Sequence, residues 1–188
     1  MKTFSSFTMI RHPLEQVWAT MRDRLPEIAM QMEDLESIVV VERSVESDGR
    51  LRLVNRWNAK QQVPALLENA LGGKTIHWID RAVWDDGLRK CTWSIEPSVL
   101  AGHIECGGTT RYEPAMAGRG TRVTFEGYFS LKPGFLDGFP AAFEPTIAGF
   151  AETIVSSVIP RNLARAVAAA GQLIATENAA AQCAQPNK

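Results

Sequence analysis

The stretch that decides the fold runs from Thr146 to Thr176 and reads TIAGFAETIVSSVIPRNLARAVAAAGQLIAT. Placed on a helix at about 100° per residue, its first half gathers large apolar side chains on one side and polar or small ones on the other. The apolar stripe consists of Ile147, Phe150, Ala151, Ile154, Val155 and Val158. Each fully buried large side chain contributes roughly 1.5–3 kcal/mol. The stripe therefore predicts a broad apolar surface elsewhere in the chain that covers this helix.

Pro160 stands in the middle of this helical pattern. A proline inside a helix removes a backbone hydrogen bond and bends the axis. Beyond it, Leu163, Val167 and Ile174 would lie roughly opposite the first stripe if the winding continued unchanged. We expect a long C-terminal helix that bends at Pro160 and changes which side faces the rest of the protein.

Seven segments upstream alternate between apolar and polar residues or are rich in β-branched residues, which is typical of strands. Turn signals, such as Asp48-Gly49 and Asp86-Gly87, separate them. The predicted strands are Lys2–Ile10, Ile38–Val45, Leu51–Asn58, Thr75–Trp84, Leu88–Glu96, Ala101–Tyr112 and Thr121–Leu131. Two short helices, Leu14–Leu25 and Pro26–Met32, follow the first strand, and a third is expected at Pro64–Ala70. Gly107-Gly108, inside a strand, predicts a bulge or a sharp bend.

The chain of 188 residues favours one domain, which we place at residues 1–176, with residues 177–188 as a mobile tail. Its composition is that of an ordinary soluble globular protein, and a net charge of −1 gives no reason to expect a nucleic-acid partner. Cys91, Cys106 and Cys183 are too far apart for a metal motif or a disulfide framework. No apolar run reaches the length of a membrane span. We expect a cytoplasmic protein without stable membrane insertion, although transient membrane contact stays open.

The order of strand, two short helices, strand meander and long C-terminal helix resembles the helix-grip fold of the START-like (SRPBCC) superfamily, which includes polyketide cyclases and allergens of the Bet v 1 type. The resemblance covers about Lys2 to Ala175. Two stretches, Val39–Leu51 with Arg56 and Thr109–Pro114, resemble the PRELI-like lipid-transfer branch. The predicted fold is α+β, with a curved seven-stranded antiparallel sheet wrapped around the C-terminal helix. What the resemblance implies is a deep apolar cavity between them that holds a hydrophobic small molecule.

Strand alternation predicts which side chains would line that cavity. Leu51, Leu53, Asn55 and Trp57 share one face of their strand, and Cys91, Trp93 and Ile95 share one face of another. Val123, Phe125, Gly127 and Phe129 do the same on the last strand. With Phe150 and Ile154 from the helix, these aromatic residues and Asn55 are the ligand-binding residues that we predict. The alternative is that they only fill a core, as inward apolar residues do in any sheet.

The strand Thr75–Trp84 can be placed in two ways. If His77, Ile79, Arg81 and Val83 face inward, Arg81 is a buried cation that needs an anion, which Glu105 or an acidic ligand would supply. If Trp78 and Trp84 face inward instead, Arg81 is solvated. The first placement adds Arg81 and Glu105 to the predicted ligand-binding residues.

No spacing among the three histidines indicates a metal site or a catalytic base, and we expect neither a metal nor a cofactor. Arg161 and Arg165 follow Pro160 on the helix and either hold an anionic group at the cavity mouth or face solvent. The sequence names no catalytic residue.

Three functions follow from these patterns. The first is binding or transfer of a hydrophobic small molecule, such as a lipid or polyketide, with an opening at Pro160 and at the loop Lys60–Lys74. The second is a cyclase or aromatase type of enzyme that uses the same cavity. The third is a protein-interaction domain with a filled core and an exposed helix face. The sequence leaves the oligomeric state open.

Overall fold

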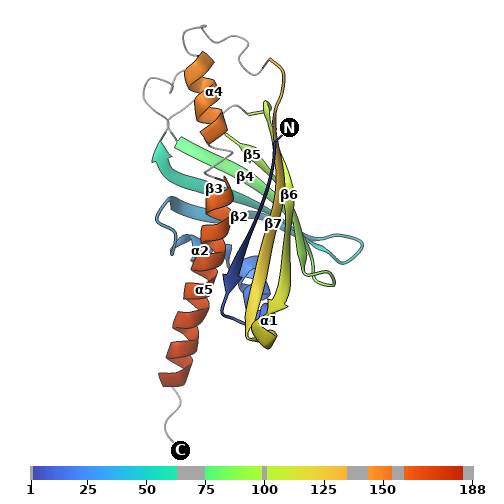
Figure 1. The fold of residues 1–188 in the computed structure, drawn as a ribbon, viewed down its shortest axis with the longest axis vertical. Coiled ribbons are helices and arrows are strands. Elements are labelled where there is room, and N and C mark those ends of the chain that lie inside the picture. Colours follow the sequence, from blue (N-terminus) through green and yellow to red (C-terminus); the bar gives the residue numbers. More distant parts are fainter. Residues whose placement is uncertain (1, 63–74, 99–100, 135–143, 154–158, 184–188) are drawn as a thin grey trace, which may run out of the picture.

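The structure is a computed structural model that describes residues 2–62, 75–98, 101–134, 144–153 and 159–183. Its centre is one seven-stranded antiparallel sheet with the strand order β1-β7-β6-β5-β4-β3-β2 (Figure 1). The strands are β1 (Lys2–Ile10), β2 (Leu35–Val45), β3 (Leu51–Gln62), β4 (Thr75–Asp85), β5 (Lys90–Pro97), β6 (Ile104–Ala115) and β7 (Gly120–Leu131). The seven-stranded antiparallel sheet predicted from the sequence is confirmed.

The chain after β1 builds the sheet as a meander, because each strand from β2 to β7 pairs with the next along the chain. The first strand then pairs with the last, from Lys2 opposite Phe129 to Ile10 opposite Thr121. The pairing of β2 with β3 shifts register twice, between Leu35 and Ser37 and between Val40 and Glu42. Such irregularities bend and twist a strand.

The two short helices after β1 are α1 (Leu14–Asp23) and α2 (Leu25–Ala29). Their apolar side, which includes Val17, Trp18 and Ile28, is buried. The Trp18 indole N–H donates a hydrogen bond of 2.7 Å to Asp86 in the turn after β4, and this bond fixes α1 against the β4–β5 hairpin. The predicted pair of helices is therefore confirmed. The helix predicted at Pro64–Ala70 lies outside the described residues.

The C-terminal part contains two helical segments, α4 (Glu144–Thr153) and α5 (Ile159–Cys183). In Figure 1, α5 runs along the sheet, and it packs on α1, α2 and β1. It buries Ala166, Val167, Ala170 and Ile174. Of the described side chains, those after Pro160 dock this helix on the sheet. The large side chains of the apolar stripe before Pro160, which we expected to be decisive, lie outside the described residues.

The end of this helix differs from the sequence prediction. We expected a mobile tail from Glu177, but α5 remains helical through Cys183. Both oxygens of the Glu177 carboxylate pair with the Arg24 guanidinium, at 2.6 and 2.8 Å. This surface ion pair connects α5 to Arg24, the residue between α1 and α2, a contact that composition alone does not reveal.

A row of two aromatic residues and two glycines crosses the inner face of the sheet. Phe4, Gly127, Gly108 and Trp93 stand directly opposite one another on β1, β7, β6 and β5. A Cβ atom at Gly127 would lie 2.3 Å from the Phe4 ring, and one at Gly108 would lie 2.7 Å from the Trp93 ring. The two rings lie over the glycines and stack with their centroids 6.3 Å apart. Both Gly107 and Gly108 pair in register with β5 and β7, so the strand has no bulge there, and the alternative of a sharp bend stays a prediction.

Candidate functional site

A pocket lies between the inner face of the sheet and the helices. Its floor consists of side chains from β3 to β7, and α1, α2 and α5 contribute Met21, Leu25, Asn162, Leu163 and Ala166. About 640 Å³ is free of protein atoms, including the part open to solvent, and about 60 Å³ of this admits the centre of a water-sized sphere. Since one water needs about 10–15 Å³ by the second measure, the pocket holds a few waters or one compact organic group.

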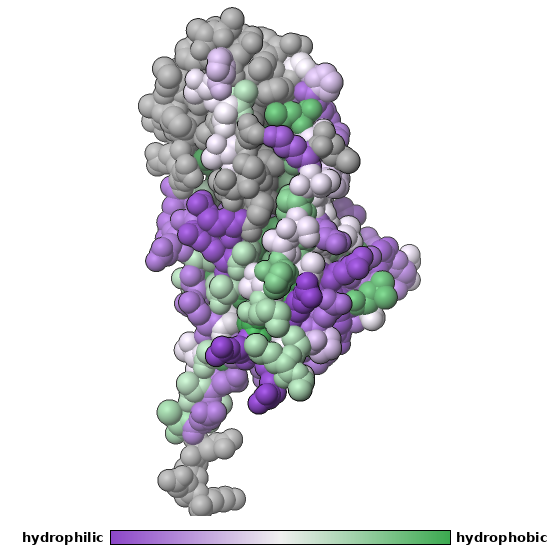
Figure 2. All heavy atoms as spheres, in the orientation of Figure 1, coloured by the Kyte–Doolittle hydropathy of each residue, from purple (hydrophilic) through white to green (hydrophobic). Residues whose placement is uncertain are grey.

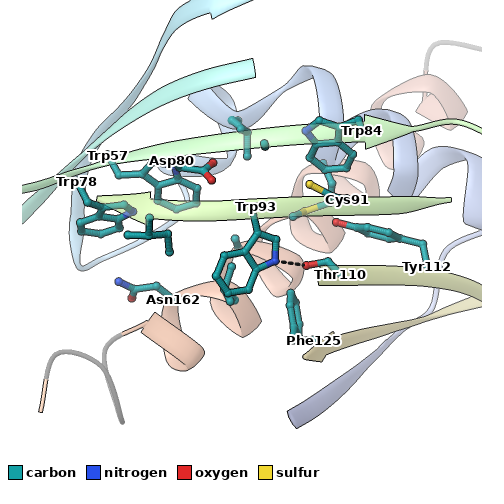
Figure 3. A pocket seen from close by; sticks show the side chains of 16 residues that line it. Trp57, Trp78, Asp80, Trp84, Cys91, Trp93, Thr110, Tyr112, Phe125 and Asn162 are labelled. Atoms are coloured by element: carbon teal, nitrogen blue, oxygen red, sulfur yellow. Dashed lines mark hydrogen bonds between the residues drawn. The ribbon is translucent and has the colours of Figure 1, made fainter. Parts of the chain in front are cut away.

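The walls of this pocket are mostly aromatic (Figure 3). The aromatic residues that line it are Trp57, Trp78, Trp84, Trp93, Tyr112 and Phe125. Trp57 and Trp78 are cross-strand neighbours whose rings stack with centroids 5.6 Å apart. The Trp93 indole N–H donates a hydrogen bond of 3.0 Å to the Thr110 hydroxyl, so its edge is satisfied.

The strand β4 presents its tryptophans to the pocket. Trp78, Asp80, Ala82 and Trp84 face inward, and Ala82 and Trp84 are buried. Arg81 therefore points to the opposite face, where its guanidinium lies 3.3 Å from the Glu96 carboxylate. Of the two possible placements of this strand, the structure has the one with Trp78 and Trp84 inside. Burial of two indole rings is favourable, whereas burial of the arginine would be costly.

Asp80 is the charged residue that the second placement of β4 brings into the pocket. The Asn55 amide N–H donates a hydrogen bond of 3.0 Å to one of its carboxylate oxygens, and Asn55 is fully buried. Figure 3 shows Asp80 between Trp57 on one side and Trp84 on the other. Asp80 is partly buried and is one of the residues that line the pocket.

Burial raises the pKa of Asp80 to about 6, and the hydrogen bond from Asn55 and the nearby Trp57 N–H only partly oppose this rise. The Trp57 N–H contributes by proximity, because it does not reach hydrogen-bond geometry with any described acceptor. The Trp84 N–H and the Asn162 side-chain oxygen also have no partner in the described part of the chain. Buried polar groups normally have partners. Unpartnered groups around an apolar pocket indicate a place where a ligand or water binds.

The other titratable groups near Asp80 stay neutral at physiological pH. Burial raises the pKa values of the Cys91 thiol and the Tyr112 hydroxyl well above their usual ranges, and the Asp80 charge raises both further. The Cys106 thiol, on the same face, has a pKa raised by burial to about 12. Among the described residues, no arginine, lysine or histidine lines the pocket. Asp80 is therefore the pocket's one ionisable group near neutral pH in that part of the chain.

The structure gathers part of the predicted site. Trp57, Trp93 and Phe125 line the pocket, and Asn55 lies next to it through its bond to Asp80. Phe129 is buried on the same face but does not border the pocket as described. The side chain of Phe150 and all of Ile154 lie outside the described residues.

Two predicted polar residues are not in the pocket. Arg81 pairs with Glu96, and Glu105, an exposed residue, lies 3.6 Å from the Lys132 ammonium. Of the two placements considered for β4, the structure has the one that leaves Arg81 solvated, so that neither Arg81 nor Glu105 faces the pocket. Arg165 also has another role, since it forms an ion pair with Asp34.

Sequence reasoning missed Asp80, Trp78 and Trp84 as pocket residues. Their signal was the alternation Trp78-Asp80-Ala82-Trp84, which by itself does not show which face of the strand points inward. The three cysteines are free, with Cys91 and Cys106 buried and Cys183 exposed. Within the described ranges, no cluster of three or more potential ligands is arranged to hold a metal ion. No helix in those ranges is both long and apolar enough to cross a membrane.

Comparison with known proteins places the fold. No protein-family model matches the sequence, and no curated protein matches it. Among solved structures, TTHA0849 from Thermus thermophilus is similar at 20% identity, with 94% of this chain and 99% of that chain covered and a TM-score of 0.62. The Zhui aromatase/cyclase from Streptomyces sp. R1128 is 16% identical over 92% of this chain and 95% of its own, with a TM-score of 0.64.

A third similar structure is Ara h 8.0201, at 13% identity over 93% of this chain and 98% of its own, with a TM-score of 0.57. At these identities the likeness concerns the fold alone. The chain has the START-like (SRPBCC) helix-grip fold, as the order of its elements indicated. The resemblance to the PRELI-like branch stays a prediction.

Proposed function

We propose that this protein binds a compact hydrophobic small molecule in the pocket between the sheet and α5. The observation that carries the proposal is the pocket wall, where four tryptophans, one tyrosine and one phenylalanine surround unfilled space. Large aromatic side chains that only built a core would pack against one another and leave little space. Apolar walls with a few polar groups are the usual composition of a small-molecule site.

The proposal can be tested with a variant that fills the pocket. Leu163 lines the pocket from α5 and is partly buried, whereas Ala168 is exposed on the same helix. Protein purified from its native host and extracted for mass spectrometry should yield one enriched small molecule. Leu163→Trp should lose that molecule, and Ala168→Trp should retain it. If the wild-type protein carries no small molecule and binds none from a library of hydrophobic compounds, the proposal is wrong.

A second candidate function, a cyclase or aromatase type of reaction, is favoured by Asp80. A carboxyl with a pKa of about 6 that faces a pocket exchanges protons readily near neutral pH. The similar fold of an aromatase/cyclase adds weight to this candidate. Turnover of a linear polyketide that Asp80→Asn abolishes without loss of polyketide affinity would establish it. Equal turnover by both proteins would exclude Asp80 as the proton-transfer group.

The third function weighed from the sequence, an interaction domain with a filled core, has less support. The pocket leaves the core incompletely filled. On the face shown in Figure 2, hydrophobic residues form a narrow band down the middle of the described part, and hydrophilic residues flank it. The described residues of that face therefore form no single broad apolar patch of the kind that marks a protein interface.

A further inference from the structure

We propose that the pocket recognises a protonated amine, whose ammonium group pairs with the Asp80 carboxylate while its hydrophobic body lies against the tryptophan rings. This inference rests on the proposed binding function and names the chemical class of ligand.

Among the described residues, Asp80 has no positively charged partner. Its side chain lines the aromatic pocket, and within the described residues the one side-chain hydrogen bond to it comes from the neutral Asn55 amide, at 3.0 Å. The nearby cation on the same strand, Arg81, faces the other side of the sheet and pairs with Glu96. No cation among the described residues lowers the pKa of Asp80. A buried carboxylate without a positive partner is costly, and a cationic ligand removes that cost.

The aromatic rings of the pocket also favour a cation. Trp57, Trp78, Trp84 and Trp93 come from three adjacent strands and line one pocket together with Asp80 (Figure 3). The face of an indole ring attracts a cation, and the attraction grows when water is excluded. Aromatic cages with a carboxylate are therefore suited to organic ammonium groups. The rings contact the carbon atoms and attract the positive charge, and the carboxylate pairs with it.

Several groups face Asp80 from neighbouring elements. Asn55 on β3 is neutral, and Cys91 on β5 and Tyr112 on β6 stay protonated at neutral pH. From α5, Asn162, Leu163 and Ala166 add no charge. In the described pocket only Asp80 then changes its charge between pH 5 and 8. The affinity for an amine should therefore rise with the ionised fraction of Asp80.

The Asn55 contact keeps the carboxylate oriented for this role. A carboxylate only accepts hydrogen bonds, so Asn55 must present its NH₂ group to Asp80. One oxygen of Asp80 is thereby occupied. Because Asp80 lines the pocket, its carboxylate can accept a further hydrogen bond there from an ammonium.

The test uses three probes of nearly equal shape, which are benzylamine, benzyl alcohol and toluene. Binding is followed by the shifts of the tryptophan indole N–H resonances in the full-length protein. At pH 7.5 we expect benzylamine to bind at least tenfold more tightly than benzyl alcohol. Because Asp80 takes up a proton near pH 6, benzylamine affinity should fall about tenfold at pH 5, where the amine itself stays protonated. Benzyl alcohol affinity should stay unchanged.

Two variants complete the design. Asp80→Asn keeps the shape and removes the charge, and should lower benzylamine affinity at least tenfold while it leaves that of benzyl alcohol within about threefold. Glu105→Gln removes an exposed carboxylate outside the pocket and should change neither. The pH comparison on the wild-type protein decides the question even where Asp80→Asn fails to fold.

The outcomes separate the two proposals. Equal affinity for benzylamine and benzyl alcohol, or amine binding that does not depend on pH, overturns the ammonium proposal and leaves the hydrophobic pocket supported. If none of the three probes shifts an indole resonance, both proposals are wrong.

Discussion

The Asp80 carboxyl shows how one residue links stability to ligand binding. Its neighbours are indole rings and one amide, which solvate a negative charge far less well than water does. The folded protein therefore holds its proton more tightly than the unfolded chain, and its pKa rises from 3.8 to about 6. A charge retained at this cost, next to space for a ligand, is a feature that functional sites share.

The first prediction concerns the pH dependence of stability. Since the folded pKa exceeds the unfolded one, the protonated carboxyl gives its full contribution below about pH 4, and this contribution disappears as the pH rises through 6. The free energy of unfolding of the wild type, compared with that of Asp80→Asn, should therefore fall by about 2 kcal/mol between pH 4 and pH 7.5. Chemical denaturation at both pH values measures the difference.

The control for this measurement is Glu105→Gln, which removes an exposed carboxylate from the other face of the sheet. Its difference from the wild type should change little over the same pH range, as expected for a surface ion pair. A flat difference between the wild type and Asp80→Asn would show that Asp80 is well solvated in the folded protein.

At the scale of elements, the packing in the middle of the sheet depends on two glycines. Gly108 and Gly127 stand side by side on β6 and β7, and the rings of Trp93 and Phe4 occupy the space where their side chains would be. Trp93 lines the pocket in this position and donates its hydrogen bond to Thr110. The glycine pair thus sets the shape of the pocket floor.

The second prediction is that Gly108→Ala destabilises the protein by about 2 kcal/mol or more. The new Cβ would lie 2.2 Å from the Glu126 carbonyl oxygen and 2.7 Å from the Trp93 ring, so backbone as well as side chain must move. Gly87→Ala is the matched control, because a Cβ there meets its nearest atom at 3.4 Å and its backbone is unstrained. Thermal unfolding of both variants tests the prediction. Equal melting temperatures of Gly108→Ala and Gly87→Ala would contradict the close packing around Gly108.

At the scale of the whole molecule, the distance between α5 and the sheet determines how much space the pocket contains. Gly171 lies where α5 passes β1, and a Cβ there would come within 2.9 Å of the Ile10 side chain. Alanines at 166, 169 and 170 are also buried on this helix. Small residues let α5 approach closely, so the pocket stays compact.

The third prediction is that Gly171→Leu weakens ligand binding although Gly171 does not line the pocket. A leucine must displace Ile10 or push α5 outward, which should cost about 1–3 kcal/mol of stability. The same substitution at the exposed Ala168 should affect neither property. Binding of the molecule recovered from the native host, measured for both variants, tests this prediction. Unchanged binding by Gly171→Leu would show that the pocket does not depend on the seating of α5.

The sequence by itself determined the order of the elements and most strand faces. Alternation placed Leu53, Asn55, Trp57, Trp93 and Phe125 on the inner side, and all five are buried there. This worked because the side-chain period of a strand is two, so that one clear apolar face fixes the whole strand. The turns and the helix after Pro160 could also be predicted, because their signals lie within a few neighbouring residues of the sequence.

Only the tertiary structure decided the orientation of β4, because large apolar side chains stand on both of its possible faces. Its neighbours resolved the choice, since Ala82 must fit opposite Trp93 and Trp78 stacks on Trp57. That placement brought Asp80 inside and moved Arg81 outside. Whether a charged residue such as Asp80 faces inward depends on how the whole strand packs against its neighbours. The sequence of the strand alone does not show where those neighbours lie.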